Sequence, residues 1–290
     1  MSTARIVGLT ALAMLAFAGN SLLCRMALRH TGIDAATFTT IRLVAGAAML
    51  LLLSAGSRRL QSLDGNWFSA LALFTYAACF SFAYVSLPAG SGALLLFGAV
   101  QATMIGHGLW NGERLRGLPL LGFSLAVAGL CGLLLPGLSA PPLFGSLLML
   151  GAGVAWGFYS LRGRTAGDPT RVTAGNFLRA VPLTLLLSAL LLPTARFDAP
   201  GACYAIASGA LTSGLGYAIW YRVLPALRST TAATVQLSVP VIAGLGGVVF
   251  IGEALSLRLL VASAAILGGI ALVIVKRKPA RAGGVPANRT

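Results

Sequence analysis

Long apolar runs with few charged side chains fill most of this sequence and restrict what it can fold into. Each run is close to the ~20 residues that an α-helix needs to cross the hydrocarbon core of a bilayer. Only 9% of the residues are charged, against about 25% in ordinary soluble domains. The sequence therefore predicts an all-α membrane protein. The ten transmembrane helices that we expect lie at roughly 5–28, 34–56, 66–87, 90–111, 116–136, 143–163, 172–195, 200–221, 230–250 and 256–275.

One block of sequence occurs twice, first from Leu87 to Pro136 and again from Leu224 to Val275. Each copy has a Leu-Pro-Ala corner, a helix rich in small residues, a Gly-Glu loop and a closing apolar helix. The segment 91–113 overlays 231–253 without a gap. Because corner, loop and closing helix recur in the same order, the sequence indicates an internal duplication, as many transporters have.

The duplication divides the chain into two units of five spans around a central cavity. We expect a first repeat at 1–138, a second at 139–277, and a basic, disordered cytoplasmic tail at 278–290. Because five is an odd number, the second repeat should cross the membrane inverted relative to the first. The two Gly-Glu loops should then lie on opposite faces, with Glu113 inside and Glu253 outside.

The positive charge sets the expected orientation. The net charge of +15 comes from basic residues scattered between apolar runs, so we do not expect a nucleic-acid-binding surface. Lys and Arg collect in short cytoplasmic loops. With the N-terminus inside, fifteen of them fall on inner segments and four on outer segments. We therefore predict a multi-pass protein of the bacterial inner membrane, with both termini cytoplasmic.

The side chains that intramembrane enzymes and ion-coupled transporters use are missing from the expected places. The sequence contains no paired nucleophile and base, no metal-binding spacing and no phosphate loop, so we expect no enzyme activity, no cofactor and no metal. All six acidic residues lie near span ends, which leaves no carboxylate at the midplane to couple protons or sodium. His107 is the remaining candidate for proton coupling, and a hydrogen-bonded boundary residue is the alternative.

Polar and aromatic side chains at mid-depth predict a substrate cavity, because an amide or hydroxyl in hydrocarbon needs a partner or water. Packing between helices is the alternative for each. Spans four and nine, rich in small residues, should pack closely at the centre, and Pro240 should remove a backbone hydrogen bond in span nine and expose a carbonyl. Arg42 and Arg179 should anchor at headgroup layers, with gating contacts as the alternative. The residues that we expect to line one cavity are Asn20, Tyr76, Phe80, Phe97, Gln101, Trp156, Tyr159, Tyr217, Gln236 and Ser238.

Four sequence features together resemble a known transporter family. They are the small-residue motif with Asn20, the Ile41-Arg42-Leu43 pattern, the Leu-Pro-Ala corners and the repeated Gly-Glu loops. This set resembles the EamA-type transporters of the drug/metabolite transporter superfamily, and the aromatic spacing of spans three and four is similar to that of the family's bacterial aromatic amino acid exporters. The resemblance implies export through a central cavity between two inverted halves. Ala18 stands where the family usually has Trp, whereas Trp156 keeps that residue in the second half.

Taken together, these patterns favour an inner-membrane exporter of amino acids, aromatic or other small zwitterions. A zwitterion suits a cavity of amides, hydroxyls and aromatic rings, whereas a cation would call for buried acids. We expect alternating access with facilitated movement and no ion coupling. The alternatives are a proton-coupled drug/metabolite exporter, a nucleotide-sugar or polyamine transporter, a lipid flippase and a non-transporting scaffold. The expected partners are the small-molecule substrate and membrane lipid, and a monomer is compatible with the sequence.

Overall fold

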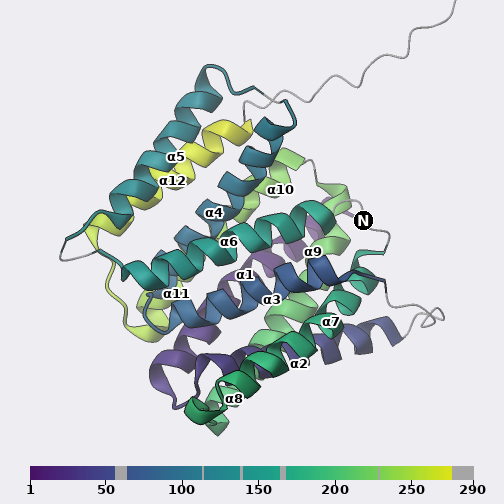
Figure 1. The fold of residues 1–290 in the computed structure, drawn as a ribbon. Coiled ribbons are helices and arrows are strands. Elements are labelled where there is room, and N and C mark those ends of the chain that lie inside the picture. The colour runs from purple at the N-terminus through teal and green to yellow at the C-terminus, as the bar shows by residue number, and fades with distance from the viewer. Residues whose placement is uncertain (56–63, 113, 138–139, 164–167, 228, 276–290) are drawn as a thin grey trace, which may run out of the picture.

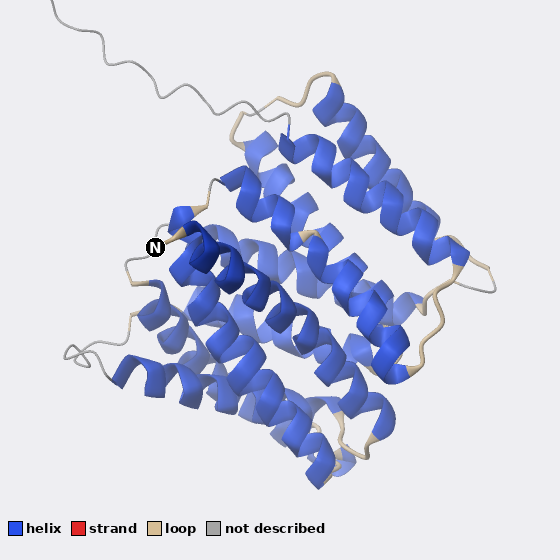
Figure 2. Ribbon diagram, turned by 180° about the vertical axis from the view of Figure 1, so that it is seen from behind, coloured by secondary structure: helices blue, strands red, loops and turns tan. Residues whose placement is uncertain are grey.

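The computed structural model is helical throughout the part it describes, which comprises residues 1–55, 64–112, 114–137, 140–163, 168–227 and 229–275. No strand occurs in these ranges, and the helices lie as roughly aligned rods (Figures 1 and 2). The helices are α1 (Thr3–His30), α2 (Ala35–Ala55), α3 (Trp67–Tyr84), α4 (Ala89–Trp110), α5 (Leu118–Leu134), α6 (Leu143–Gly163), α7 (Pro169–Leu190), α8 (Ala199–Ala207), α9 (Gly216–Val223), α10 (Ser229–Gln236), α11 (Ser238–Ile251) and α12 (Leu257–Val275).

Within the described ranges, nine helical segments are long and apolar enough to cross a membrane. The fifth predicted span appears as the shorter apolar helix α5, which has 17 residues. It lies alongside α12 in both ribbon views (Figures 1 and 2). Glycines allow the two backbones to approach, since a Cβ on Gly129 would lie 2.8 Å from the Cβ of Ala265. The expected all-α, multi-span architecture is confirmed, and the ten predicted spans coincide with these helices.

Two of the long segments are interrupted in the middle of their length. The segment that contains α8 and α9 changes to a π-helix over Ser208–Leu215, a local geometry that is frequent at functional sites. The other interruption lies at Leu237, between α10 and α11. Pro240 cannot donate to the carbonyl of Gln236 four residues earlier, and this missing hydrogen bond, expected from the sequence, accounts for the break.

Helix α4 is the centre of the packing. Its residues from Ala89 to Gln101 are all buried, and it contacts α6 and α11. A Cβ on Gly90 would lie only 2.9 Å from the Cα of Gly244 in α11, so only glycine allows this approach. The predicted close packing of spans four and nine is therefore confirmed, and its physical cause is the pair of small residues at the crossing.

Helices from both predicted repeats pack against one another. Helix α1 contacts α9 and α11, and α2 contacts α7 and α8. The boundary predicted at 138/139, the predicted tail at 278–290 and Glu113 lie outside the described residues. This arrangement brings side chains from distant parts of the sequence to one interior region.

Candidate functional site

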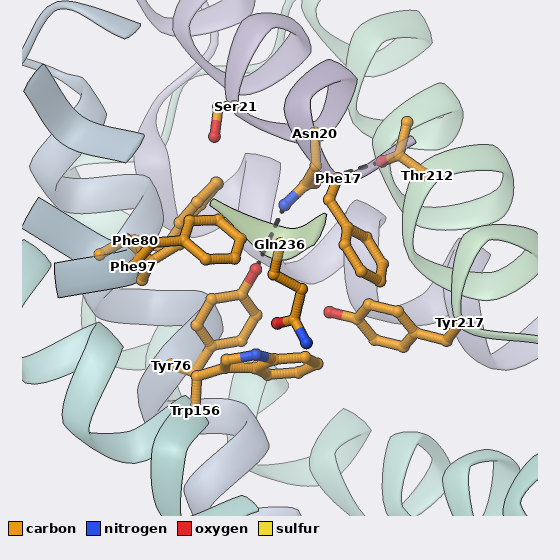
Figure 3. Close-up of a pocket in the computed structure, with 11 residues that line it drawn as sticks. Phe17, Asn20, Ser21, Tyr76, Phe80, Phe97, Trp156, Thr212, Tyr217 and Gln236 are labelled. Carbon is orange, nitrogen blue, oxygen red and sulfur yellow. Dashed lines mark hydrogen bonds between the residues drawn. The ribbon is translucent and has the colours of Figure 1, made fainter. Parts of the chain in front are cut away.

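A small chamber lies at the centre of the helices, and we call it the central chamber (Figure 3). Its free volume of about 20 Å³ is close to that of a single water molecule. Asn20 of α1, Tyr76 of α3 and Trp156 of α6 meet there. The lining residues are Phe17, Asn20, Ser21, Tyr76, Phe80, Leu96, Phe97, Trp156, Thr212, Tyr217 and Gln236.

Asn20 links the two predicted repeats through hydrogen bonds inside the chamber. Its amide nitrogen donates to the Tyr76 hydroxyl at 3.2 Å, and its amide oxygen accepts from the Ser208 hydroxyl at 2.7 Å. Thr212 also lies 3.3 Å from that oxygen, and Figure 3 shows it on the side of Asn20 opposite Tyr76. The amide is thus both a lining group and a contact between helices, which unites the two interpretations that the sequence leaves open.

Aromatic rings form most of the remaining wall. Trp156 is the central member, with its ring centroid 4.9 Å from that of Tyr76 and 5.0 Å from that of Tyr217. Tyr76 also packs on Phe80 at 5.4 Å. Such pairs contribute about 0.5–1.5 kcal/mol each beyond the area they bury, so they hold the wall in a defined shape. Their faces offer apolar and cation-attracting surface to a ligand.

A second, larger cavity continues from the chamber, and we call it the vestibule. It has a volume of about 320 Å³ and shares Phe17, Trp156, Tyr217 and Gln236 with the chamber. It reaches the exposed turn at Pro225, beyond the end of α9. In the predicted topology this is the cytoplasmic end. Its other lining residues are Val100, Gln101, Met104, Ser160, Gly163, Pro169, Trp220, Tyr221, Leu224, Leu227, Ala232 and Ala233.

The opposite end of the molecule is held closed by a buried ion pair, and we call it the closed end. Arg25 Nε lies 2.9 Å from Glu253 Oε1, and their side chains are 9% and 6% exposed. Arg25 also donates to the carbonyl oxygens of Tyr84 and Val85, at 2.9 and 3.0 Å. The second oxygen of Glu253 accepts from the backbone N–H of Ala89 at 2.7 Å. Because both charges are paired and hydrogen-bonded, their burial is tolerated, and the cluster joins α1, the α3–α4 turn and the α11–α12 loop.

A second polar contact ties the same end together. The backbone N–H of Asp34 donates to the Arg196 carbonyl at 3.1 Å, and its carboxylate accepts from the Arg196 N–H at 2.7 Å. Partial burial of Asp34 would raise its pKa, but hydrogen bonds from the Thr37 hydroxyl and from the N–H groups of Arg196, Thr37 and Ala36 outweigh it. The pKa of Asp34 is therefore below its usual value, so the carboxylate is ionised when it caps α2.

The comparisons with known proteins identify the family. The EamA-like transporter family matches residues 143–275. The chain is also 57% identical to the uncharacterized protein PA1977 of Pseudomonas aeruginosa, over 96% of this chain and 97% of that protein. The chain belongs to the EamA-like transporter family. It is thus a multi-pass membrane transporter of the drug/metabolite transporter superfamily, as the sequence motifs indicate.

Two further similarities place this EamA-like transporter among its relatives. It is 31% identical to the threonine/homoserine exporter RhtA of Escherichia coli, over 54% of this chain and 55% of that protein. A solved crystal structure covers 94% of this chain with a TM-score of 0.66 and 22% identity, which shows the shared fold. The alignment with the Escherichia coli exporter thus extends over about half of each protein.

Most of the residues predicted to line a cavity lie at these two cavities of the EamA-like fold. Gln101 lines the vestibule, and Trp156, Tyr217 and Gln236 line both cavities. The others in the chamber are Asn20, Tyr76, Phe80 and Phe97.

Two of the predicted positions lie outside both cavities. Tyr159 stacks on Trp156 at 5.3 Å, but its hydroxyl accepts from Asn176 at 3.4 Å and lines a separate polar pocket beside α7. Ser238 lines neither the chamber nor the vestibule, because it begins α11 and its hydroxyl donates to the Val235 carbonyl at 2.6 Å. Both side chains are polar, and each is turned toward a neighbour outside the two cavities.

Four residues that line the chamber were not foreseen from the sequence, namely Phe17, Ser21, Leu96 and Thr212. Phe17 lies three residues before Asn20, and this spacing places both on one face of α1. Ser208 and Thr212 are four residues apart in the π-helical segment and both contact Asn20. The polar sequence from 208 to 213, set in an otherwise apolar span, is the signal that could have revealed them.

The basic residues within spans differ from expectation in one case. Arg42 is only 1% exposed, so the prediction that it reaches a headgroup layer is wrong; its guanidinium packs against Tyr76 and Phe80 inside the bundle. Arg179 binds the carbonyl oxygens of Asp64 and Gly175, as an anchoring residue would. His107 is exposed near the end of α4, where its ring pairs with Asn111 at 3.0 Å. This placement matches the interpretation of His107 as a boundary residue.

Proposed function

We propose that this EamA-like transporter exports amino acids, aromatic or other small zwitterions, across the bacterial inner membrane. The observation that carries the proposal is a chamber of amide, hydroxyl and aromatic groups, continuous with a vestibule at one end and separated from the other end by a buried ion pair. The name of the Escherichia coli relative, a threonine/homoserine exporter, supports amino acids as the substrate class.

The chemistry of the two cavities suits a zwitterion with an apolar side chain. Asn20 and Gln236 present amide groups to the chamber, and Trp156 and Tyr217 present aromatic surface. Those ring faces attract an ammonium group, while hydroxyl and amide N–H groups donate to a carboxylate. We propose the predicted residues of the two cavities as the substrate contacts, with Tyr159 supporting Trp156 from behind and Ser238 shaping the break in span nine.

We further propose that two inverted repeats alternate access to the chamber. In this proposal the closed end faces the periplasm and the vestibule faces the cytoplasm. During transport the end at the second Gly-Glu loop opens while the end at the first closes. Single cysteines at Arg114 and Leu255, in a background without native cysteines, test the inversion with membrane-impermeant maleimide. We expect labelling of position 114 from inside and of position 255 from outside. Labelling of both from one side would contradict the inverted arrangement.

Transport should follow the substrate gradient without an ion. The proposal is supported by the exposed position of His107 and by the use of the Glu253 carboxylate in an ion pair with Arg25. High internal amino acid concentration would then drive export. Uptake into proteoliposomes should be unaffected by an imposed pH gradient. Several-fold accumulation that collapses with a protonophore and with His107→Ala would make His107 the coupling residue.

The experiment that tests the function is counterflow in proteoliposomes with radiolabelled amino acids. We expect the purified protein to exchange internal unlabelled amino acid for external labelled amino acid. The exchange should be fastest for one group of amino acids with similar side chains. Labelled phospholipid should not move. Lipid movement without amino acid exchange would identify a flippase. The absence of both activities would favour a non-transporting scaffold.

A further inference from the structure

Arg42 in α2 is a buried cation that has no carboxylate paired with it among the described residues. Its side chain is almost fully enclosed, and the ion pairs found among the described residues do not include it. Nη2 donates to the Tyr76 hydroxyl at 3.1 Å. Nε and Nη1 have no hydrogen-bond partner in the part of the chain that the structure describes. Most of the hydrogen-bonding capacity of this guanidinium is therefore unused.

Aromatic rings compensate for only part of the cost of burying this charge. The guanidinium carbon lies 4.8 Å from the ring centroid of Phe80 and 5.3 Å from that of Tyr76. Cation–π attraction is weaker than the penalty for removing an unpaired ion from water. Arg25 shows the ordinary solution in the same protein, because its guanidinium is paired with Glu253 and bonded to two carbonyl oxygens. Arg42 would therefore gain from an anion that the described part of the chain does not supply.

The position of Arg42 is directly behind the wall of the central chamber. Tyr76 and Phe80, the two rings that it touches, both line the chamber. The Tyr76 hydroxyl also pairs with Asn20, so one oxygen joins Arg42 to a lining amide. The backbone of Arg42 is fixed by close packing, since its carbonyl lies against Gly209 where a Cβ would collide. Close packing of α2 on the π-helical segment therefore holds Arg42 at this wall.

We propose that Arg42, together with the Tyr76 hydroxyl and the Asn20 amide, forms a subsite for the carboxylate group of the substrate. A guanidinium binds a carboxylate through two parallel hydrogen bonds, which matches its unused donors. The remainder of the substrate would extend past Trp156 into the vestibule. The inference rests on the proposed function for the identity of the substrate, but it assigns a ligand class, an organic carboxylate, that can be tested separately.

A purely structural role is the competing explanation. In that case Arg42 would only hold α2 against α3 through its contacts with Tyr76 and Phe80. Loss of the side chain would then weaken folding or reduce the amount of active protein. It would not change how the remaining folded protein distinguishes an acid from its uncharged amide. The ratio of the affinities for the acid and for its amide therefore separates the two roles.

The test is ligand titration of the full-length protein in lipid nanodiscs, followed by tryptophan fluorescence. Trp67→Phe and Trp110→Phe remove two exposed indoles and leave Trp156 and Trp220, which line the cavities. The probes are L-threonine, L-phenylalanine and benzoate, each compared with its carboxamide. We expect the background protein to bind at least one acid about tenfold or more tightly than its amide, because a charge-assisted hydrogen bond is lost in the amide.

Arg42→Gln should bring the affinities of acid and amide to within about threefold of each other, since the guanidinium charge no longer distinguishes them. Arg179→Gln is the matched control, because it removes the internal arginine of α7, which lines neither the chamber nor the vestibule, and it should keep the full ratio. An unchanged ratio in folded Arg42→Gln overturns the inference. If that variant does not fold, Arg42→Lys decides: a several-fold loss for the acid alone supports the subsite, and unchanged acid affinity overturns it.

Benzoate and its carboxamide distinguish the carboxylate subsite from the proposal of amino acid export. Binding of benzoate that depends on Arg42, without binding or counterflow of any amino acid, would support the carboxylate subsite and reject amino acid export. Counterflow of amino acids with an acid-to-amide ratio near one would support export and reject the subsite. Failure of the background protein to bind any of the three acids overturns the subsite.

Discussion

The two Gly-Glu loops share a local sequence but lie in different surroundings. Both glycines have positive φ, +87° at Gly112 and +67° at Gly252, so the backbone turns in the same left-handed way at the two ends. At the closed end, Glu253 is 8% exposed and binds Arg25. At the other end, the loop follows Trp110, which is 91% exposed. The sequence of the loop alone therefore does not set whether an end is closed.

The contacts of Glu253 account for the burial of the second loop. Glu253 meets Arg25 and the N–H of Ala89, which belong to the first predicted repeat. In the half of α4 that leads to the first loop, Met104 lines the vestibule together with Ala232 of α10. Two copies of one motif in unlike environments are what a single state of an alternating transporter should present. Mutations at the closed end should thus alter access, whereas mutations at the cavities should alter binding.

The largest effect should come from Glu253→Ala. It leaves Arg25 buried without its carboxylate, and breaking a buried ion pair typically costs about 3–5 kcal/mol. The closed end should open, so that a cysteine at Ser21 in the chamber is labelled by impermeant maleimide from the outer side. Arg29→Ala is the control, because its exposed side chain lies 3.5 Å from the same carboxylate and should contribute at most about 1 kcal/mol. Equal labelling rates in the two variants would contradict the claim that the Arg25–Glu253 ion pair keeps this end closed.

Trp156→Ala should abolish most transport while leaving the closed end shut. The ring packs on Tyr76, Tyr159 and Tyr217, and a buried Trp→Ala change costs about 3–5 kcal/mol. Counterflow should fall more than tenfold, with a smaller loss for Gln101→Ala. Trp110→Ala, at an exposed position, should transport normally. If Trp156→Ala and Gln101→Ala both transport every amino acid normally at normal expression, the cavity is assigned to the wrong residues.

Gly90→Ala should weaken the crossing of α4 and α11 near the closed end. The added Cβ would lie 2.9 Å from the Cα of Gly244, a backbone atom that cannot move independently, and overpacking costs about 1–3 kcal/mol. Gly106→Ala on the same helix meets nothing within 4 Å and should gain up to about 1 kcal/mol of helix propensity. Thermal unfolding in nanodiscs measures both variants. Equal unfolding temperatures would show that the approach of the two glycines is not needed.

Asp34→Ala should have the smallest effect and a defined pH dependence. The carboxylate caps α2 and binds the N–H of Arg196, and loss of such a cap costs about 1 kcal/mol. Because the pKa of Asp34 is lower in the folded protein, its contribution is present above the unfolded value of about 3.9 and disappears as the pH falls through the folded pKa. The unfolding temperatures of variant and parent should differ at pH 7 and converge under more acidic conditions. A constant difference across that range would contradict the role of the ionised form.

The sequence was sufficient for the helices and for the closest crossings. Apolar runs of membrane-spanning length leave the backbone few alternatives, and the glycine pair at 90 and 244 requires a close approach. It was not sufficient for the direction of side chains. Helices that are apolar all round have no polar face to set their rotation, so Tyr159 and Arg42 could not be oriented before their neighbours were known. The Ser21 and Phe17 positions were hidden for the same reason.

The pairing of Arg25 with Glu253 was likewise beyond the sequence. Both residues could be placed at the same predicted face, but not in contact, because 228 positions separate them. Their burial depends on how α1 meets the α11–α12 loop, which is a property of the assembled bundle.

Distances between spin labels across the two ends test the alternating-access account most directly. One pair, at Val85 and Leu257, flanks the closed end, and the other, at Trp110 and Ala226, flanks the vestibule; all four positions are exposed. Double electron–electron resonance in nanodiscs, on protein without native cysteines, should give a longer distance for the first pair and a shorter one for the second when Glu253→Ala is introduced. An increase in both distances, or no change in either, would contradict a mechanism in which one end opens as the other closes.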